Sequence, residues 1–89
     1  MKLKDGFILS AVGGEWLAAP VGANAAKFHG VIRLNESGAY IWRGLAEGLD
    51  PEKIAENMCA EYDGLDAPTA ERAVASIIEK LRANGILED

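Results

Sequence analysis

A chain of 89 residues with a formal net charge of −5 is short and acidic, which argues against a protein that binds the phosphate backbone of nucleic acids. It has no apolar run near the ~20 residues of a membrane-spanning helix, no apolar signal segment at its start, and one cysteine, Cys59, which cannot form an internal disulfide. We therefore expect residues 1–89 to form one cytoplasmic domain with no membrane partner.

Residues 7–20 predict a β-hairpin. Apolar residues alternate along both halves, and Gly13-Gly14 between them supplies the positive φ angles that a two-residue turn requires. This turn sets the register so that Leu9 lies opposite Ala18, and one face of the hairpin is expected to be the core side. The predicted core side consists of Phe7, Leu9, Ala11, Trp16 and Ala18.

A loop at residues 21–29 and a short third strand at residues 31–34 are expected next. The strand runs directly into a helix, and Asn35 at the junction is a good N-cap because its side chain accepts from a backbone N–H two or three residues further on. The helix is predicted over residues 36–47, and Gly48 follows it as the residue that takes the left-handed conformation. One residue therefore joins the predicted strand to the predicted helix.

Two further helices complete the predicted order. Asp50 before Pro51 starts the first of them, as an N-cap followed by proline in the first turn, and Gly64 ends it. The last helix is the longest, over residues 67–83, and its apolar side chains recur at helical spacing. They are Ala70, Val74, Ile77, Ile78 and Leu81.

The end of the chain completes the predicted fold. Asn84-Gly85-Ile86 is expected to end the last helix in a Schellman-type cap, and residues 87–89 are expected to be a frayed or extended tail. Strands come first and helices follow, so the predicted fold class is α+β. Its expected architecture is a three-stranded antiparallel sheet followed by three helices.

The residue types that carry most enzyme chemistry are scarce. His29 and Cys59 are the only histidine and cysteine, they fall in different predicted elements, and zinc requires about four N, S or O ligands. No third group is placed to orient a Cys–His pair. Trp16 and Trp42 fall at strand and helix spacing and are expected in the core. We expect no catalytic residue, no metal ion and no cofactor.

A DNA-binding protein is the alternative function. The short turn between the last two helices has helix-turn-helix spacing, which would direct the start of the last helix into the major groove. That start, residues 67–73, contains one Arg and one Glu and no cluster of cations. A winged-helix DNA-binding or transcription-associated protein remains the alternative, and the salt dependence of binding to DNA would distinguish it.

An edge strand of a three-stranded sheet has unpaired backbone N–H and C=O groups. If this strand is residues 31–34, it carries no proline and one charge, Arg33, so it lacks the usual protection against pairing. Either a peptide adds there as a fourth strand, or the preceding loop or a helix covers the edge. In the first case, Ile32→Pro is expected to remove an N–H and abolish peptide binding without unfolding the protein.

The run Arg33-Leu34-Asn35-Glu36-Ser37-Gly38-Ala39-Tyr40-Ile41-Trp42 resembles the PqqD family, peptide chaperones of pyrroloquinoline quinone biosynthesis. Members typically show a short strand, then Leu-Asn-Glu-Ser/Thr-Gly/Ala and an Ile/Leu-Trp pair. The helix start at Asp50-Pro51-Glu52, the stretch Glu61-Tyr62-Asp63 and residues 80–87 are also similar to that family. The resemblance covers essentially the whole chain.

The resemblance implies a winged-helix-like domain that recognises a ribosomally made precursor peptide. Such domains hold the leader of the precursor against the third strand and third helix, and present it to a modifying enzyme, often a radical S-adenosylmethionine enzyme. No nucleic acid or cofactor is implied. An open edge also allows two copies to pair, so we expect a monomer or a homodimer.

The resemblance also implies which residues bind the peptide. On the strand they are Val31, Ile32, Arg33 and Leu34. On the last helix the candidates are Glu71, Ala75, Ile78 and Arg82, which lie along one rim of its apolar stripe. The opposite rim has Ala73, Ile77 and Lys80, and the sequence does not determine which rim faces the strand.

Overall fold

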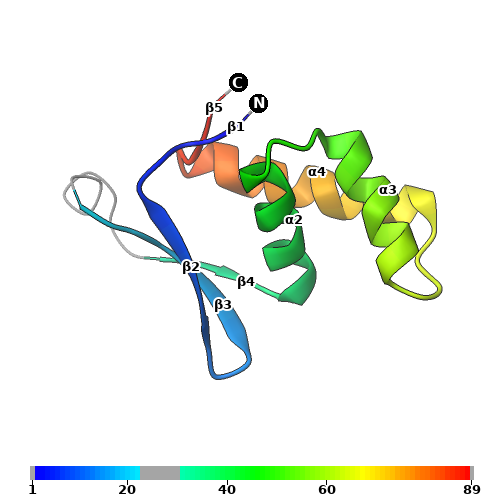
Figure 1. Ribbon diagram of the computed structural model, residues 1–89, viewed down its shortest axis with the longest axis horizontal. Helices are drawn as coiled ribbons and strands as arrows, with labels where there is room; N and C mark the ends of the chain where they lie inside the picture. Colours follow the sequence, from blue (N-terminus) through cyan, green and yellow to red (C-terminus); the bar gives the residue numbers. More distant parts are fainter. Residues whose placement is uncertain (1, 23–30, 89) are drawn as a thin grey trace.

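The structure is a computed structural model that describes residues 2–22 and 31–88 (Figure 1). An antiparallel sheet in the order β2-β3-β4 is followed by three helices in this part of the chain, which confirms the α+β class. The strands of the sheet are β2 (Phe7–Val12), β3 (Glu15–Pro20) and β4 (Ile32–Leu34). The helices are α2 (Glu36–Ala46), α3 (Pro51–Glu61) and α4 (Ala67–Ala83).

The hairpin has the register that its Gly-Gly turn predicts. Leu9 pairs with Ala18, and Gly13 and Gly14 have φ angles of +52° and +83°. The face toward the helices contains Phe7, Leu9, Trp16 and Ala18, all buried or half-buried. Ala11 is exposed, contrary to expectation, because the tip of the hairpin extends beyond the helices (Figure 1).

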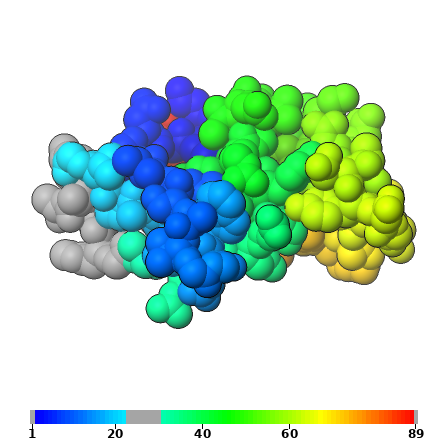
Figure 2. Space-filling model, turned by 60° about the horizontal axis from the view of Figure 1, so that its bottom comes forward, coloured from blue at the N-terminus to red at the C-terminus, as the bar shows by residue number. Residues whose placement is uncertain are grey.

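The outer face of the hairpin is open to solvent. Ile8 and Val12 are 52% and 56% exposed there, and Figure 2 shows the hairpin, in blue, at the front of the molecule with no helix over it. The opposite face of the sheet packs against α2, and the core continues from there between the three helices.

Each helix begins at a side-chain cap. Asn35 accepts from the N–H of Gly38 at 2.8 Å and Asp50 from that of Lys53 at 2.8 Å, as predicted. The cap of α4 was not predicted: the carboxylate of Asp66 accepts from the N–H of Thr69 at 2.9 Å. These bonds satisfy backbone donors that the first turn of a helix leaves without partners.

The end of α4 forms the predicted Schellman cap. The N–H of Ile86 donates to the carbonyl of Leu81 at 2.9 Å, and Gly85 has a φ angle of +72°. Beyond the cap, Leu87 and Glu88 are extended, which is one of the two states expected for residues 87–89, and Asp89 lies outside the described residues. β5 (Leu87–Glu88) pairs with β1 (Lys2–Leu3), a two-stranded sheet that brings the chain ends together (Figure 1).

The core is built around α2, with α3 and α4 packed against it. The largest fully buried side chains come from all three helices and are Ile41, Leu45, Ile54, Met58, Val74 and Leu81. Trp42 is 6% exposed and meets Phe7 edge-on, with ring centroids 6.5 Å apart, which confirms its place in the core. Trp16 is half-buried, and the guanidinium of Arg43 lies 4.9 Å from its ring centroid.

The predicted loop and the expected absence of a membrane-spanning helix are the two remaining expectations about the fold. Residues 23–29 of the predicted loop, His29 among them, are not part of the described structure. Over residues 2–22 and 31–88, every helix is too short or too polar to cross a bilayer.

The close approach of α2 and α3 generates a stability prediction. A Cβ on Gly44 would lie 2.8 Å from Cγ1 of Ile54, whose side chain is fully buried. We expect Gly44→Ala to lower the free energy of unfolding by about 1–2 kcal/mol, because overpacking outweighs the gain in helix propensity. Chemical denaturation monitored by circular dichroism measures it, with Ala46→Ser, on the exposed side of α2, as the control. Equal stability of Gly44→Ala and wild type would contradict the packing described for these two helices.

Candidate functional site

β4 is an edge strand of its sheet. It pairs with β3 through Ile32 opposite Ala18 and Leu34 opposite Trp16. Among residues 2–22 and 31–88, no strand pairs with its other side. The expectation that this strand forms the edge is therefore confirmed for the described part of the chain.

The hairpin register determines which main-chain groups of β4 point outward. Residues that flank a two-residue turn form a hydrogen-bonded pair, and such pairs alternate with non-bonded pairs along the ladder. Counting from the turn, Leu17 bonds to β2, so the residues on either side of it direct their main-chain groups to β4. Their partners on β4 are Ile32 and Leu34, which therefore bond inside the sheet. Arg33, between them, directs its N–H and C=O away from β3.

α4 provides the residues that meet this outward edge. Lys80 Nζ donates to the carbonyl oxygen of Arg33 at 2.7 Å, which agrees with the outward orientation of that carbonyl. Ile77, one turn before Lys80, reaches the junction of β4 and α2, where a Cβ on Gly38 would lie 3.2 Å from its Cδ1. The rim of α4 that faces β4 is therefore the one with Ala73, Ile77 and Lys80.

We call this arrangement the β4–α4 edge, and it consists of Val31, Ile32, Arg33 and Leu34 with Ala73, Ile77 and Lys80. Leu34 is 4% exposed and belongs to the core, whereas Ile32 and Ile77 are half-buried and present apolar atoms beside it. Arg33 and Lys80 are exposed. Val31 is 48% exposed and precedes the strand, which starts one residue later than predicted.

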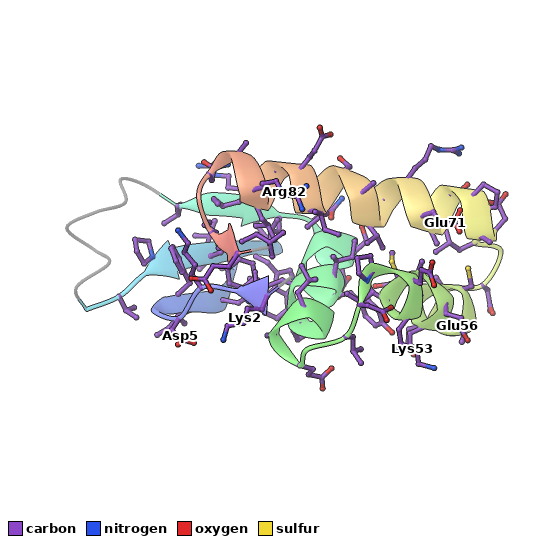
Figure 3. All side chains as sticks on the ribbon, turned by 90° about the horizontal axis from the view of Figure 1, so that it is seen from above. Lys2, Asp5, Lys53, Glu56, Glu71 and Arg82 are labelled. Carbon is purple, nitrogen blue, oxygen red and sulfur yellow. The ribbon has the colours of Figure 1, made fainter. Side chains whose placement is uncertain are left out.

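The other predicted rim lies on the opposite side of α4. Its residues line a hollow of about 430 Å³ together with the start of α3. The lining consists of Pro51, Glu52, Glu71, Val74, Ala75, Ile78, Glu79 and Arg82. Figure 3 shows Glu71 and Arg82 toward the two ends of α4. The structure thus brings Ile77 and Lys80 to β4, and it groups Glu71, Ala75, Ile78 and Arg82 next to α3 instead.

Possible metal ligands and the single cysteine are further candidates for a site in the described part of the chain. Within residues 2–22 and 31–88, His, Cys, Asp and Glu side chains do not gather in groups of three that would hold a metal ion. Cys59 is half-buried and packs against the hydrophobic core. The chemistry that the β4–α4 edge offers is main-chain hydrogen bonding beside apolar and cationic side chains.

These features define a class of protein: a small winged-helix-like domain with an edge strand beside a helix rim. A family model described as "Coenzyme PQQ synthesis protein D (PqqD)" matches residues 8–87. The chain belongs to the PqqD family, as the resemblance of residues 33–42 indicated.

Two solved structures have the same fold over nearly the whole chain. The structure of TbiB1 in complex with the TbiA(beta) leader peptide has a TM-score of 0.77 and 30% sequence identity, and the match covers 99% of this chain and 95% of that one. The structure of a lasso peptide synthetase B1 complexed with the leader peptide has a TM-score of 0.76 and 22% identity, with 99% and 96% covered. A comparison with curated proteins finds no match.

The cap that starts α4 generates a prediction about pH. Hydrogen bonds from the side chain and then the backbone N–H of Thr69 hold the pKa of Asp66 below its usual value of 3.8, with a smaller effect of Arg72. A carboxyl group with a lowered folded-state pKa stabilises the protein above its unfolded pKa, and this contribution disappears as the pH falls through the folded pKa.

We therefore expect Asp66→Asn, which keeps an acceptor at the cap, to lose less stability than the wild type between about pH 4 and pH 2. Thermal unfolding followed over this range measures the difference. Asp50→Asn, which makes the same exchange at the cap of α3, is the comparison variant. Parallel pH profiles of wild type and Asp66→Asn would contradict the role given to the Asp66 carboxylate.

Proposed function

We propose that the protein is a non-catalytic peptide chaperone that binds the leader of a ribosomally synthesised precursor peptide and presents it to a modifying enzyme. The observation that carries the proposal is the outward main chain of Arg33 on an edge strand beside α4. Membership of the PqqD family and the likeness to TbiB1, solved with a leader peptide, support it. In this family the modifying enzyme is often a radical S-adenosylmethionine enzyme.

The leader would bind by strand addition. Its backbone would pair with the N–H and C=O of Arg33 and, by the same alternation, of Val31, while its side chains contact the half-buried Ile32 and Ile77. Ordering a disordered leader costs about 2–5 kcal/mol. A contact below ~1,200 Å² in total suits a complex that must release its peptide to an enzyme.

The contribution of α4 is assigned to the rim with Ala73, Ile77 and Lys80. Glu71, Ala75, Ile78 and Arg82 do not fit the same strand, because they line the hollow on the other side of the helix. Val31, Ile32, Arg33 and Leu34 remain the strand side of the proposed site.

The chemistry belongs to the partner enzyme in this proposal. The chain itself acts as one peptide-recognition domain over residues 1–89, in the cytoplasm, and without a cofactor of its own. The alternative of a winged-helix DNA-binding protein is not favoured, because the two similar solved structures contain leader peptides. Titration with random duplex DNA over a range of salt concentrations tests it, since a DNA-binding protein shows a steep logarithmic dependence on salt.

Arg33→Pro tests strand addition. It removes the outward N–H of β4 and leaves the bonds of Ile32 and Leu34 to β3 in place, as proline on an edge strand allows. We expect it to weaken leader binding about ten- to hundredfold, since the peptide carbonyl opposite loses its donor. Isothermal titration calorimetry measures the affinity, with synthetic leader peptides taken from short reading frames beside this gene as candidate ligands.

Two control variants complete the experiment. Arg33→Ala keeps the backbone N–H and is expected to change affinity by less than Arg33→Pro. From the sequence, Ile32→Pro is expected to abolish peptide binding without unfolding the protein. The register changes this expectation, because the N–H of Ile32 bonds to β3, so Ile32→Pro is expected to lower the melting temperature. Full affinity of a folded Arg33→Pro variant would exclude strand addition at β4.

A further inference from the structure

Lys80 occupies the space that an added strand requires. Its Nζ lies 2.7 Å from the carbonyl oxygen of Arg33, and this bond joins α4 to β4 across 47 residues of sequence. A strand added to β4 would place its backbone about 4.8 Å from it. The ammonium group stands within that distance, so it must move away before a peptide can pair with Arg33.

We propose that Lys80 closes the β4 edge when no peptide is bound and selects peptide segments that carry Asp or Glu beside it when the edge opens. The inference rests on the proposed function and adds the chemistry of the peptide. Lysine is a common protection of exposed strand edges against unwanted pairing. Here it comes from a neighbouring helix, so it can leave the edge without disturbing the sheet.

The charges around the β4–α4 edge support an acidic partner. The α4 residues that share the rim of Lys80 by helical spacing, Ala73, Ile77 and Asn84, are uncharged, so an acidic side chain of a bound peptide would be the charged acceptor nearest by position on this rim. Arg33 adds a second exposed cation from β4.

Two acidic residues of α4 lie on its other side. Glu71 and Glu79 line the hollow beside α3, and the chain as a whole carries a net charge of −5. Among the residues of the β4–α4 edge, the charged ones are Arg33 and Lys80, and both are cations. With a neutral peptide the displaced ammonium donates to water, whereas an acidic side chain offers it a charge-assisted hydrogen bond.

A selection experiment with a random library of displayed 12-residue peptides tests the preference. The baits are wild type, Lys80→Glu and the control Lys53→Glu, which reverses an exposed lysine of α3. We expect wild type and Lys53→Glu to enrich Asp or Glu at one position of the selected peptides. Lys80→Glu is expected to lose this preference and to enrich Lys or Arg at the same position.

A double-mutant cycle measures the pair directly. One selected peptide and its Glu→Gln variant are titrated into wild type and Lys80→Met. With the wild-type protein, the Glu→Gln change in the peptide is expected to weaken binding about two- to fivefold, as for an exposed ion pair. With the Lys80→Met protein, the same change in the peptide is expected to have no effect. The wild-type difference should shrink as salt is added.

Sedimentation velocity tests the closing role. Lys80→Met leaves the Arg33 carbonyl open, so it is expected to self-associate at lower concentration than wild type, while Lys53→Met is not. Identical sedimentation of wild type and Lys80→Met overturns the closing role. Melting curves of each variant confirm that it is folded.

The outcomes separate this inference from the proposed function. If wild type selects peptides that bind β4 without a preference for Asp or Glu, the role of Lys80 is overturned and strand addition is left intact. The same holds if Lys80→Glu selects peptides with the same acidic preference as wild type. Failure of every bait to select a peptide overturns strand addition, and the inference with it.

Discussion

The junction at Asn35 is the constraint on which the rest of the structure depends. The side chain of Asn35 accepts from the N–H of Gly38 at 2.8 Å and from the hydroxyl of Ser37 at 3.1 Å. Asn35 is therefore the single residue between the end of β4 and the start of α2. The absent Cβ of Gly38 lets Ile77 of α4 approach the same point. Three elements therefore meet at one short turn, and the outer side of β4 is held next to α4 before any peptide arrives. With an edge of this kind, the costs of the proposed binding are the ordering of the peptide and the displacement of Lys80.

α4 has two sides with different surroundings, and this division organises the proposed function. Its Ile77–Lys80 side faces β4, and its Glu71–Arg82 side borders a hollow next to α3. The helix is held at its start by the Asp66 cap and at its end by the Schellman cap, beyond which β5 pairs with β1. A rigid helix keeps the rim at a constant distance from the edge strand, as recognition by main-chain pairing requires.

Local chemistry explains which elements were predictable. The caps at Asn35 and Asp50, the Gly-Gly turn and the bounds of α4 each depend on residues a few positions apart, so the sequence predicts them well. The β1–β5 pair was missed because strands of two residues have no periodicity and their partners lie at opposite ends of the chain. Ala11 was misplaced because strand alternation gives its face but not how far the helices extend along the hairpin.

By itself, the sequence determined the order of the hairpin, the third strand and the three helices, the register of the hairpin and the family to which the chain belongs, because each is encoded in short patterns of residues. Only the tertiary structure decided which rim of α4 meets β4, which main-chain groups of β4 point outward, and that Lys80 bonds to Arg33. Both rims border the same apolar stripe, so the choice between them depends on how the helices pack. Such contacts join residues far apart in the chain, and no local pattern specifies them.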